Sequence, residues 1–342
     1  MISRACCLAL LLFSRVCCAT ELVLYNWDEY LSDEVIELFL QETGIEVRQV
    51  YYDSDEERDE VLLTDARSGF DLTLIDNIAV QVLGDNHVIR PLEDFSWNDI
   101  EARWRNSCGR YGVPYSWGTF GIVYRTDKVS VAPTSWRDIV EPEAAMQGHI
   151  SWLADHIDTF IPSLKLSGES INTSDTAALK RAYSQLSDMS ELLASYTYVL
   201  TEVSRDPQVP IYMALAYSGD QYVLNNLQGG EFWAFVAPQE GTSIWVDCIS
   251  VLASSTKQVE AKTFIAFLNR PEIAALNASS VWLATPNSAA LKLVDEDLLN
   301  DRTVYPDVNT LTDSELYMNI EDANITQRVR IIRALEKRYD AQ

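Results

Sequence analysis

The chain has 342 residues, 47% of them hydrophobic, so it can bury a sizeable core and is not an intrinsically disordered protein. Its length favours two lobes over one. The 51 acidic and 26 basic residues give a formal net charge of -25, which disfavours nucleic acid as a partner and attracts cations to any cleft that gathers the acids. The charge therefore favours a cationic ligand, although an acidic surface also serves solubility.

The first residues are predicted to be an export signal and not part of the fold. The apolar run from Ala5 to Phe13 is too short to span a bilayer permanently. A cysteine at the end of a signal peptide is a typical site for a lipid anchor, so we expect residues 1–18 to be a signal peptide with lipidation at Cys17 or Cys18. Simple cleavage after Ala19 is the alternative. Either outcome places the mature protein in the periplasm, where it contacts a membrane only through such an anchor.

The remaining cysteines and the histidines disfavour several kinds of site. Outside the signal region the chain has only Cys108 and Cys248, which can form one disulfide or remain buried thiols. The three histidines occur in no zinc-binding pattern, and the P-loop, G-x-S-x-G and G-x-G-x-x-G motifs are absent. We therefore expect no metal site, no cofactor and no enzymatic activity.

Strand and helix patterns alternate from the start of the mature chain. The first predicted elements are a strand at 21–27, a helix that follows Ser32 and ends at Gly44, an extended run at 45–52, a helix at 54–67 and a buried strand at 71–75. Ser32 is a good helix cap, and glycine commonly ends helices. This order predicts a βαβ start and a helix-covered parallel sheet.

A second α/β unit is predicted to begin near Thr134, after an apolar strand at 120–124. The later predicted elements are a strand at 149–153, a long helix at 173–193, a short helix from Asp220, strands at 232–236 and 243–253, and a helix at 257–268. Two α/β units that exchange strands are the simplest interpretation, with a ligand cleft between them at the hinge. The predicted lobes are 20–123 with 247–288, and 124–246 with 289–342.

Four places combine aromatic rings with carboxylates at predicted strand ends or within a strand. They are Trp27-Asp28-Glu29-Tyr30, Asp155-His156-Ile157-Asp158, Tyr217-Ser218-Gly219-Asp220 and Trp245-Val246-Asp247. A polyamine requires this combination, because each ammonium exchanges water for oxygen acceptors while the methylenes need flat apolar walls. These places are therefore candidate ligand contacts.

Each place also has a structural explanation. The rings of the first place are equally typical of a core, and Asp155, Asp158 or Asp220 could cap a helix. If Asp155 and Asp158 open a helix, their carboxylates lie on one face and can share one ammonium. Asp247 differs from these, because a carboxylate inside an apolar strand is costly unless it meets a cation.

Five short motifs follow one another along the mature chain. They are Asn26-Trp27 with Tyr30, Phe70-Asp71-Leu72, Pro114 to Thr119, Trp245 with Asp247, and Thr285-Pro286-Asn287. As a set they resemble the periplasmic spermidine/putrescine-binding proteins of ABC importers, over essentially the whole mature chain. The resemblance implies two α/β lobes that close around a polyamine, followed by docking on permease subunits. We expect a monomer.

The resemblance also implies ligand-binding residues. Trp27 and Tyr30 match one aromatic wall, Tyr217 matches a stacking ring, and Asp220 resembles the additional acid of the putrescine-preferring branch. The full expected set is Trp27, Asp28, Tyr30, Asp76, Asp155, Asp158, Tyr217, Asp220, Trp245 and Asp247. Spermidine is the first expected ligand and putrescine the second, because four aspartates exceed the charge of a diamine.

The chain departs from the family pattern at two points. Asp76 and Ile78 stand where serine and tyrosine are often found. Leu283 stands where an aromatic residue usually precedes Thr-Pro-Asn, with Trp282 one place earlier. Both departures concern residues expected near the ligand.

Other functions remain open from the sequence. A binding protein of the same fold could take thiamine, a metal complex or a sugar, and a signalling or adhesive lipoprotein is a further alternative. A secreted hydrolase that uses Asp155 and Asp158 is disfavoured, because two acids on one helix face are badly placed to flank a scissile bond.

Overall fold

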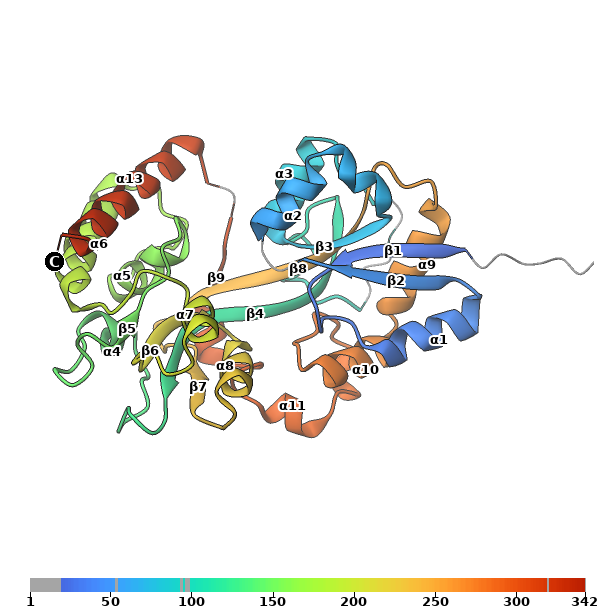
Figure 1. Cartoon of the computed structure of the whole chain (residues 1–342). Helices are drawn as coiled ribbons and strands as arrows, with labels where there is room; N and C mark the ends of the chain where they lie inside the picture. Colours follow the sequence, from blue (N-terminus) through green and yellow to red (C-terminus); the bar gives the residue numbers. More distant parts are fainter. Residues whose placement is uncertain (1–19, 53–54, 93–94, 96–98, 319, 342) are drawn as a thin grey trace, which may run out of the picture.

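The computed structural model describes residues 20–52, 55–92, 95, 99–318 and 320–341. The predicted signal peptide, with its candidate lipidation sites Cys17 and Cys18, lies outside these residues. The described chain forms two α/β lobes (Figure 1). Two long strands, β4 (Gly112–Arg125) and β8 (Ser243–Val251), run between the lobes, as the predicted strand exchange requires.

The first lobe is built on a mixed sheet. Its other strands are β1 (Glu21–Asn26), β2 (Glu46–Tyr51) and β3 (Leu72–Asp76). Its helices are α1 (Asp33–Thr43), α2 (Asp55–Leu62), α3 (Asn77–Asp85), α9 (Gln258–Leu268) and α10 (Pro271–Val281), with 3-10 turns at Asp65–Gly69 and Ala290–Lys292. Strands β2, β1 and β3 are parallel, and β8 pairs antiparallel with β3. Apolar side chains of α3 pack on one face of this sheet and those of α1 and α9 on the other.

The second lobe repeats the helix-covered arrangement. Its strands are β5 (Ile150–Ser151), β6 (Met213–Tyr217) and β7 (Trp233–Val236) together with the end of β4. Its helices are α4 (Arg137–Val140), α5 (Ile161–Leu166), α6 (Thr176–Met189), α7 (Val199–Arg205), α8 (Asp220–Gln228) and α13 (Asp322–Tyr339), with 3-10 turns at Asp158–Phe160 and Ser190–Leu192. Helices α4 to α6 and α13 line one core, and α7 and α8 line the other.

Three short elements lie in the last quarter of the chain: α11 (Glu296–Asn300), α12 (Val308–Asp313) and β9 (Glu315–Leu316), which pairs with β8. No residue pattern predicts these three elements. Leu298 and Val304 pack in the same core cluster as Ile75 of the first lobe. Residues around α11 therefore belong with that core, whereas the lobe boundary predicted at 288/289 remains a prediction.

The predicted start of the fold is confirmed in detail. Ser32 caps α1 by accepting a hydrogen bond from the backbone of Glu34, and Gly44 ends the helix in the left-handed region at φ 72°. The predicted strand at 149–153 is shorter, since only Ile150–Ser151 pair with a neighbour. The predicted helix at 54–67 is α2 followed by a 3-10 turn.

Strand β4 carries the connection between the lobes. Residues Gly112 to Thr119 pair with β8, and residues Phe120 to Arg125 pair with β6 and β7. The same strand therefore belongs to the sheet of the first lobe and then to that of the second. Side chains near Thr119 lie where the two sheets meet, at the position of the predicted cleft.

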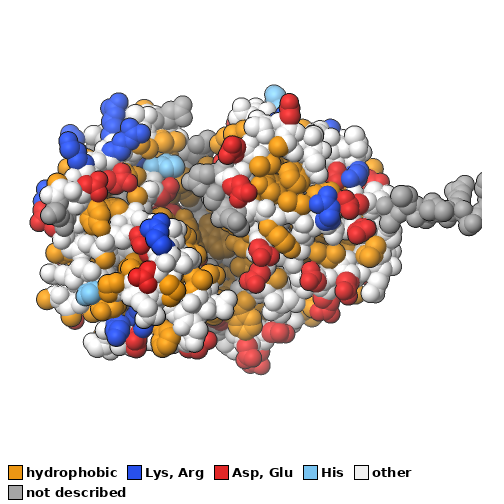
Figure 2. Space-filling view, in the orientation of Figure 1, with side chains coloured by type: hydrophobic (Ala, Val, Ile, Leu, Met, Phe, Trp, Pro, Cys, Tyr) orange, Lys and Arg blue, Asp and Glu red, His pale blue; other side chains and the backbone are white. Residues whose placement is uncertain are grey.

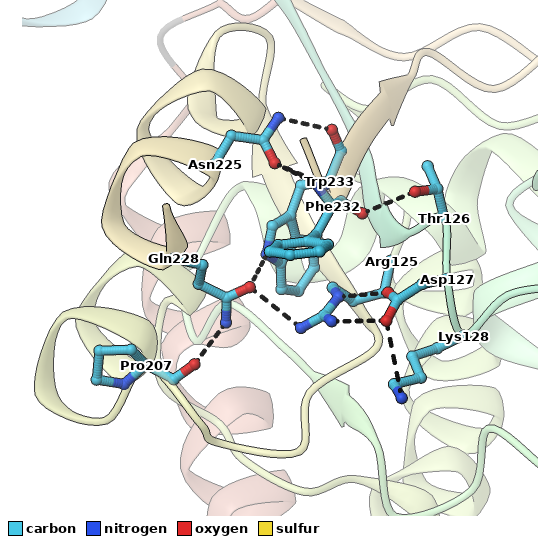
Figure 3. Close-up of polar contacts among 9 residues, drawn as sticks. All are labelled: Arg125, Thr126, Asp127, Lys128, Pro207, Asn225, Gln228, Phe232 and Trp233. Carbon is cyan, nitrogen blue, oxygen red and sulfur yellow. Dashed lines mark hydrogen bonds and ion pairs between the residues drawn. The ribbon is translucent and has the colours of Figure 1, made fainter. Parts of the chain in front are cut away.

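At the carboxyl end of β4, side-chain contacts hold helix α8 in place (Figure 3). The Arg125 guanidinium donates to both carboxylate oxygens of Asp127, at 2.7 and 2.8 Å, and to Gln228 Oε1 at 3.1 Å. It also lies 4.9 Å from the centre of the Phe232 ring. Trp233 Nε1 donates to the same Gln228 oxygen at 3.0 Å. These contacts fix the carboxyl end of α8, and hence the helix whose first residue is Asp220.

Cys108 and Cys248 form a disulfide, with their Cα atoms 5.8 Å apart. The bond joins the segment before β4 to the middle of β8, and both cysteines are fully buried in the first-lobe core. Gly112 lies directly against it, since a Cβ there would come within 3.0 Å of Cys248 Cβ and 3.3 Å of Cys108 Cβ. The bridge, one of the two alternatives open from the sequence, is thus a core element.

Removing this disulfide should destabilise the protein without changing its fold. A bridge that closes a 140-residue separation restricts the unfolded chain, so Cys108→Ala with Cys248→Ala should lower the free energy of unfolding by about 2–5 kcal/mol. Urea unfolding followed by circular dichroism measures the difference. Adding dithiothreitol should shift the wild-type midpoint towards that of the double variant and leave the variant unchanged; equal midpoints without reductant would contradict the prediction.

Candidate functional site

A hollow lies where the two lobes meet, with hydrophobic side chains in its depth (Figure 2). The ends of β1 and β6 and the middle of β8 carry the predicted rings and carboxylates, several of which lie within electrostatic reach of one another. From the first lobe come Trp27 and Tyr30, which follow β1. From the second come Asp158, Tyr198, Tyr217 and Asp220, while Trp245 and Asp247 lie on the shared strand β8.

On the second lobe, two tyrosines each donate a hydrogen bond to a carboxylate. Tyr217 Oη donates to Asp158 Oδ2, and Tyr198 Oη donates to Asp220 Oδ2. Asp220 Oδ2 also accepts the backbone N–H of Tyr217 at 2.7 Å. The two rings meet edge to face with centres 6.2 Å apart. Strand β6 and the turns beside it thus hold two acids and two rings as one unit.

These two carboxylates lie in an environment that disfavours their charge. Burial, followed by the charge of Asp155, raises the pKa of Asp158 well above its ordinary value. Burial raises the pKa of Asp220 to about 6, against the opposing hydrogen bonds from Tyr198 and Tyr217. A cation placed between them would reverse both shifts.

Asp155 is held differently from Asp158. Its Oδ1 accepts the backbone N–H groups of Ile157 at 2.6 Å and Asp158 at 3.0 Å, so it has the capping role that the sequence left open. Burial acts to raise the pKa of Asp155, but the hydrogen bond and charge of His156, together with the backbone hydrogen bonds from Asp158 and Ile157, outweigh it and the pKa is lowered. Asp155 is therefore an ionised neighbour of the less readily ionised Asp158.

On the first lobe, Trp27 and Tyr30 belong to one aromatic wall. Their ring centres are 6.4 Å apart, and the Trp27 ring lies 4.5 Å from that of Tyr52. Tyr30 is hydrogen-bonded to Asp247, and burial followed by the charges of Asp247, Tyr52 and Asp220 raises its pKa well above the usual range. Since Asp220 belongs to the second lobe, the two lobes bring their polar groups within electrostatic reach of each other.

The comparisons with known proteins agree with this architecture. The chain matches the family model for bacterial extracellular solute-binding proteins over residues 34–311. It is 31% identical over 340 residues to a norspermidine sensor of Vibrio cholerae, covering 98% of this chain and 95% of that protein. This chain belongs to the bacterial extracellular solute-binding proteins. The family consists of receptors, not enzymes.

Two further similarities extend this result. The chain is 28% identical over 307 residues to the spermidine/putrescine-binding periplasmic protein of Escherichia coli K12, covering 86% of this chain and 85% of that protein. The fold matches that of a spermidine/putrescine ABC transporter substrate-binding protein from Streptococcus pneumoniae with a TM-score of 0.82, at 24% identity and covering 94% of this chain and 100% of the other. The predicted family and two-lobed fold are confirmed.

Two members of the predicted ligand set have hydrogen-bond partners within the protein. Asp28 is exposed, and its Oδ1 accepts the backbone N–H of Glu29 at 2.9 Å. Asp76 lies beside Asp247 across the β3–β8 ladder, but its Oδ1 caps α3 and its Oδ2 binds Arg58 Nη1 at 3.0 Å. The charge of Asp76 is therefore matched within the protein.

Two contributors were not recognised from the sequence. Tyr198 precedes α7 in a segment with no periodic pattern, so its contact with Asp220 depends on the tertiary fold. Gly118 faces Trp245, and a Cβ at this position would lie 2.2 Å from Trp245 Cζ2. A glycine inside a strand pattern often marks such a close approach, and this was the available signal.

The described residues hold no evident metal centre or membrane span. Among them, no group of three or more histidine, cysteine or acidic side chains could hold a metal ion. Within the same part of the chain, no helix is both long and apolar enough to cross a bilayer.

The raised pKa of Asp220 predicts that the ligand-free protein loses stability as the pH rises. Because its folded pKa of about 6 exceeds the ordinary 3.8, the folded state binds this proton more tightly, and the stabilising effect is lost as the pH rises from about 4 through 6. Asp220→Asn should therefore gain about 1–2 kcal/mol of unfolding free energy relative to wild type between pH 4.5 and pH 7.

Urea unfolding of the ligand-free proteins at both pH values tests this. Asp188→Asn, on the exposed face of α6, is the matched control and should follow the wild type. A difference between Asp220→Asn and wild type that stays constant with pH would remove Asp220 as the titrating group.

Proposed function

We propose that this protein is an extracytoplasmic polyamine receptor whose lobes close on an extended polycation. The carrying observation is that acids and rings of both lobes lie within electrostatic reach of one another. The first lobe and β8 contribute Tyr30 and Asp247, and the second lobe contributes Asp158 with Tyr217 and Asp220 with Tyr198. Tyrosine hydroxyls, which carry no charge, hold both second-lobe carboxylates.

This arrangement suits a ligand with several ammonium groups. Asp158, beside the ionised Asp155, supports one terminal ammonium, and Asp247 supports a second nitrogen from the opposite side. The Trp27 ring and the Tyr217 ring can flank the methylenes and attract the cation through their π faces. The acids exceed what a diamine needs, so spermidine is the first ligand and putrescine the second.

The names of the relatives support the same chemistry. Relatives that cover most of this chain are named for spermidine, putrescine or norspermidine. Thiamine or another small cation in the same fold is the alternative ligand. The periplasmic names of the relatives support a periplasmic location, and an anchor through Cys17 or Cys18 and a monomeric state complete the proposal.

Calorimetry tests the ligand and the central acid together. Spermidine, putrescine and norspermidine are titrated into ligand-free wild type, Asp247→Asn and the Asp188→Asn control. Because Asp247→Asn removes the counter-charge of a buried ammonium, its dissociation constant should rise at least about thirtyfold, whereas the control should match the wild type.

Two outcomes would contradict the proposal. No heat with any of the three amines in the wild type would exclude a polyamine receptor. An unchanged dissociation constant in Asp247→Asn would remove that residue from the site.

Delivery of the ligand has two candidate destinations. ABC importer permease subunits are the first, supported by the relatives that bind spermidine and putrescine in the periplasm. A signalling receptor is the second, because the relative at 31% identity is named a sensor. Uptake of radiolabelled spermidine by cells with and without this gene separates them: loss of uptake in the deletion strain supports import, and unchanged uptake supports sensing.

A further inference from the structure

A second set of side chains joins the two lobes through hydrogen bonds that do not involve the acids and rings described above. Tyr222 lies on α8 of the second lobe, whereas Trp282 follows α10 and Asp301 follows α11 of the first. Trp282 Nε1 donates to Asp301 Oδ2 at 2.8 Å and to Tyr222 Oη at 3.1 Å. Tyr222 Oη in turn donates to Asp301.

Neighbouring residues complete this network. Asp301 Oδ1 accepts the backbone N–H of Thr303 at 2.9 Å and its hydroxyl at 2.6 Å. Gln221 Nε2, the residue before Tyr222, donates to Thr303 Oγ1 at 3.1 Å. Both oxygens of Asp301 therefore have donors from the protein itself, and its carboxylate is committed to this network instead of being available for a ligand ammonium.

The balance of effects on Asp301 agrees with this commitment. Burial acts to raise its pKa, but the donors on Thr303, Tyr222 and Trp282 together lower the pKa below the usual value. The carboxylate is thus stably ionised, in contrast to Asp158 and Asp220 in the hollow. Hydrogen bonds to an ionised acceptor are among the stronger ones in proteins.

Trp282 reaches this position through an unusual backbone. Its φ of 57° and ψ of 42° place it in the left-handed region, which is unfavourable for a bulky side chain and persists only where the surroundings fix it. Its ring packs on the first-lobe core. The tryptophan that stands one place before the usual aromatic position thus directs its indole N–H to Tyr222 and Asp301.

We propose that Tyr222, Trp282 and Asp301 form an interlobe latch that favours the closed arrangement whether or not a ligand is present. Every contact in the latch is made between groups of the chain, so none of them requires a ligand atom. Since a ligand must enter through an open form, the latch lowers the fraction of protein that is open to it. It also slows the opening that releases a bound ligand.

Small-angle X-ray scattering of ligand-free protein tests the latch independently of the proposed ligand. Tyr222→Phe removes the bridging hydroxyl, and Trp282→Phe removes the indole donor. Tyr339→Phe is the matched control, because its hydroxyl donates to Ala194 O inside the second lobe at 2.6 Å. We expect the wild type and the control to have the radius of gyration calculated from the described structure, in which these contacts join the lobes, and both latch variants a larger one.

Stopped-flow tryptophan fluorescence with spermidine gives the kinetic counterpart, using Tyr222→Phe so that all tryptophans remain. Both the association and the dissociation rate constants should rise about three- to tenfold, while the dissociation constant changes less than either rate.

Three results would overturn the latch. They are a wild-type radius of gyration already larger than that calculated from the described structure, latch variants with the same radius as the control, and a rise in the dissociation rate alone, which would mean that the contact forms only after binding. Circular dichroism confirms that each variant is folded, and Asp301→Ala replaces any variant that is not. If spermidine does not bind, the scattering result still decides the latch while the proposed ligand fails.

Discussion

Carboxylates whose charge is disfavoured by burial are the constraint on which the rest of this molecule depends. Asp158 and Asp220 are held by tyrosine hydroxyls, which donate hydrogen bonds but carry no positive charge. Their pKa values rise because of burial. In the proposed function, a small polycation supplies the counter-charge that the tyrosine hydroxyls do not provide, and selectivity for cations follows from this.

Such a site requires a rigid frame, and the two strands that run between the lobes supply it. Strand β4 passes from one sheet to the other, and β8 carries Trp245 and Asp247 beside it. Gly118 allows the Trp245 ring to lie directly on the backbone of β4. The Arg125 network fixes the far end of α8, which sets the position of Asp220 at the near end (Figure 3).

What could be predicted from the sequence is what local chemistry determines. The bounds of the first helix could be predicted from Ser32 and Gly44, because a helix cap and a residue in the left-handed conformation determine the structure of the segment next to them. Asp247 could be singled out because its strand is otherwise apolar. The partners of Asp76 and of Tyr198 could not be predicted, because Arg58 and Asp220 meet them only after segments distant in the chain have folded together. The left-handed backbone of Trp282 likewise has no local signature, since glycine is the residue expected there.

The hollow and the latch act on the same equilibrium with opposite signs in the empty protein. In the described structure Asp220 and Asp247 both lie within electrostatic reach of Tyr30, and holding these acids together without a counter-charge carries an electrostatic cost that favours opening. The latch opposes that cost through hydrogen bonds that need no ligand. A bound polycation changes the contribution of the hollow from repulsion to attraction and leaves the latch unchanged. The acids therefore contribute most of the free energy of binding, whereas the latch sets how quickly the lobes open and close around the ligand.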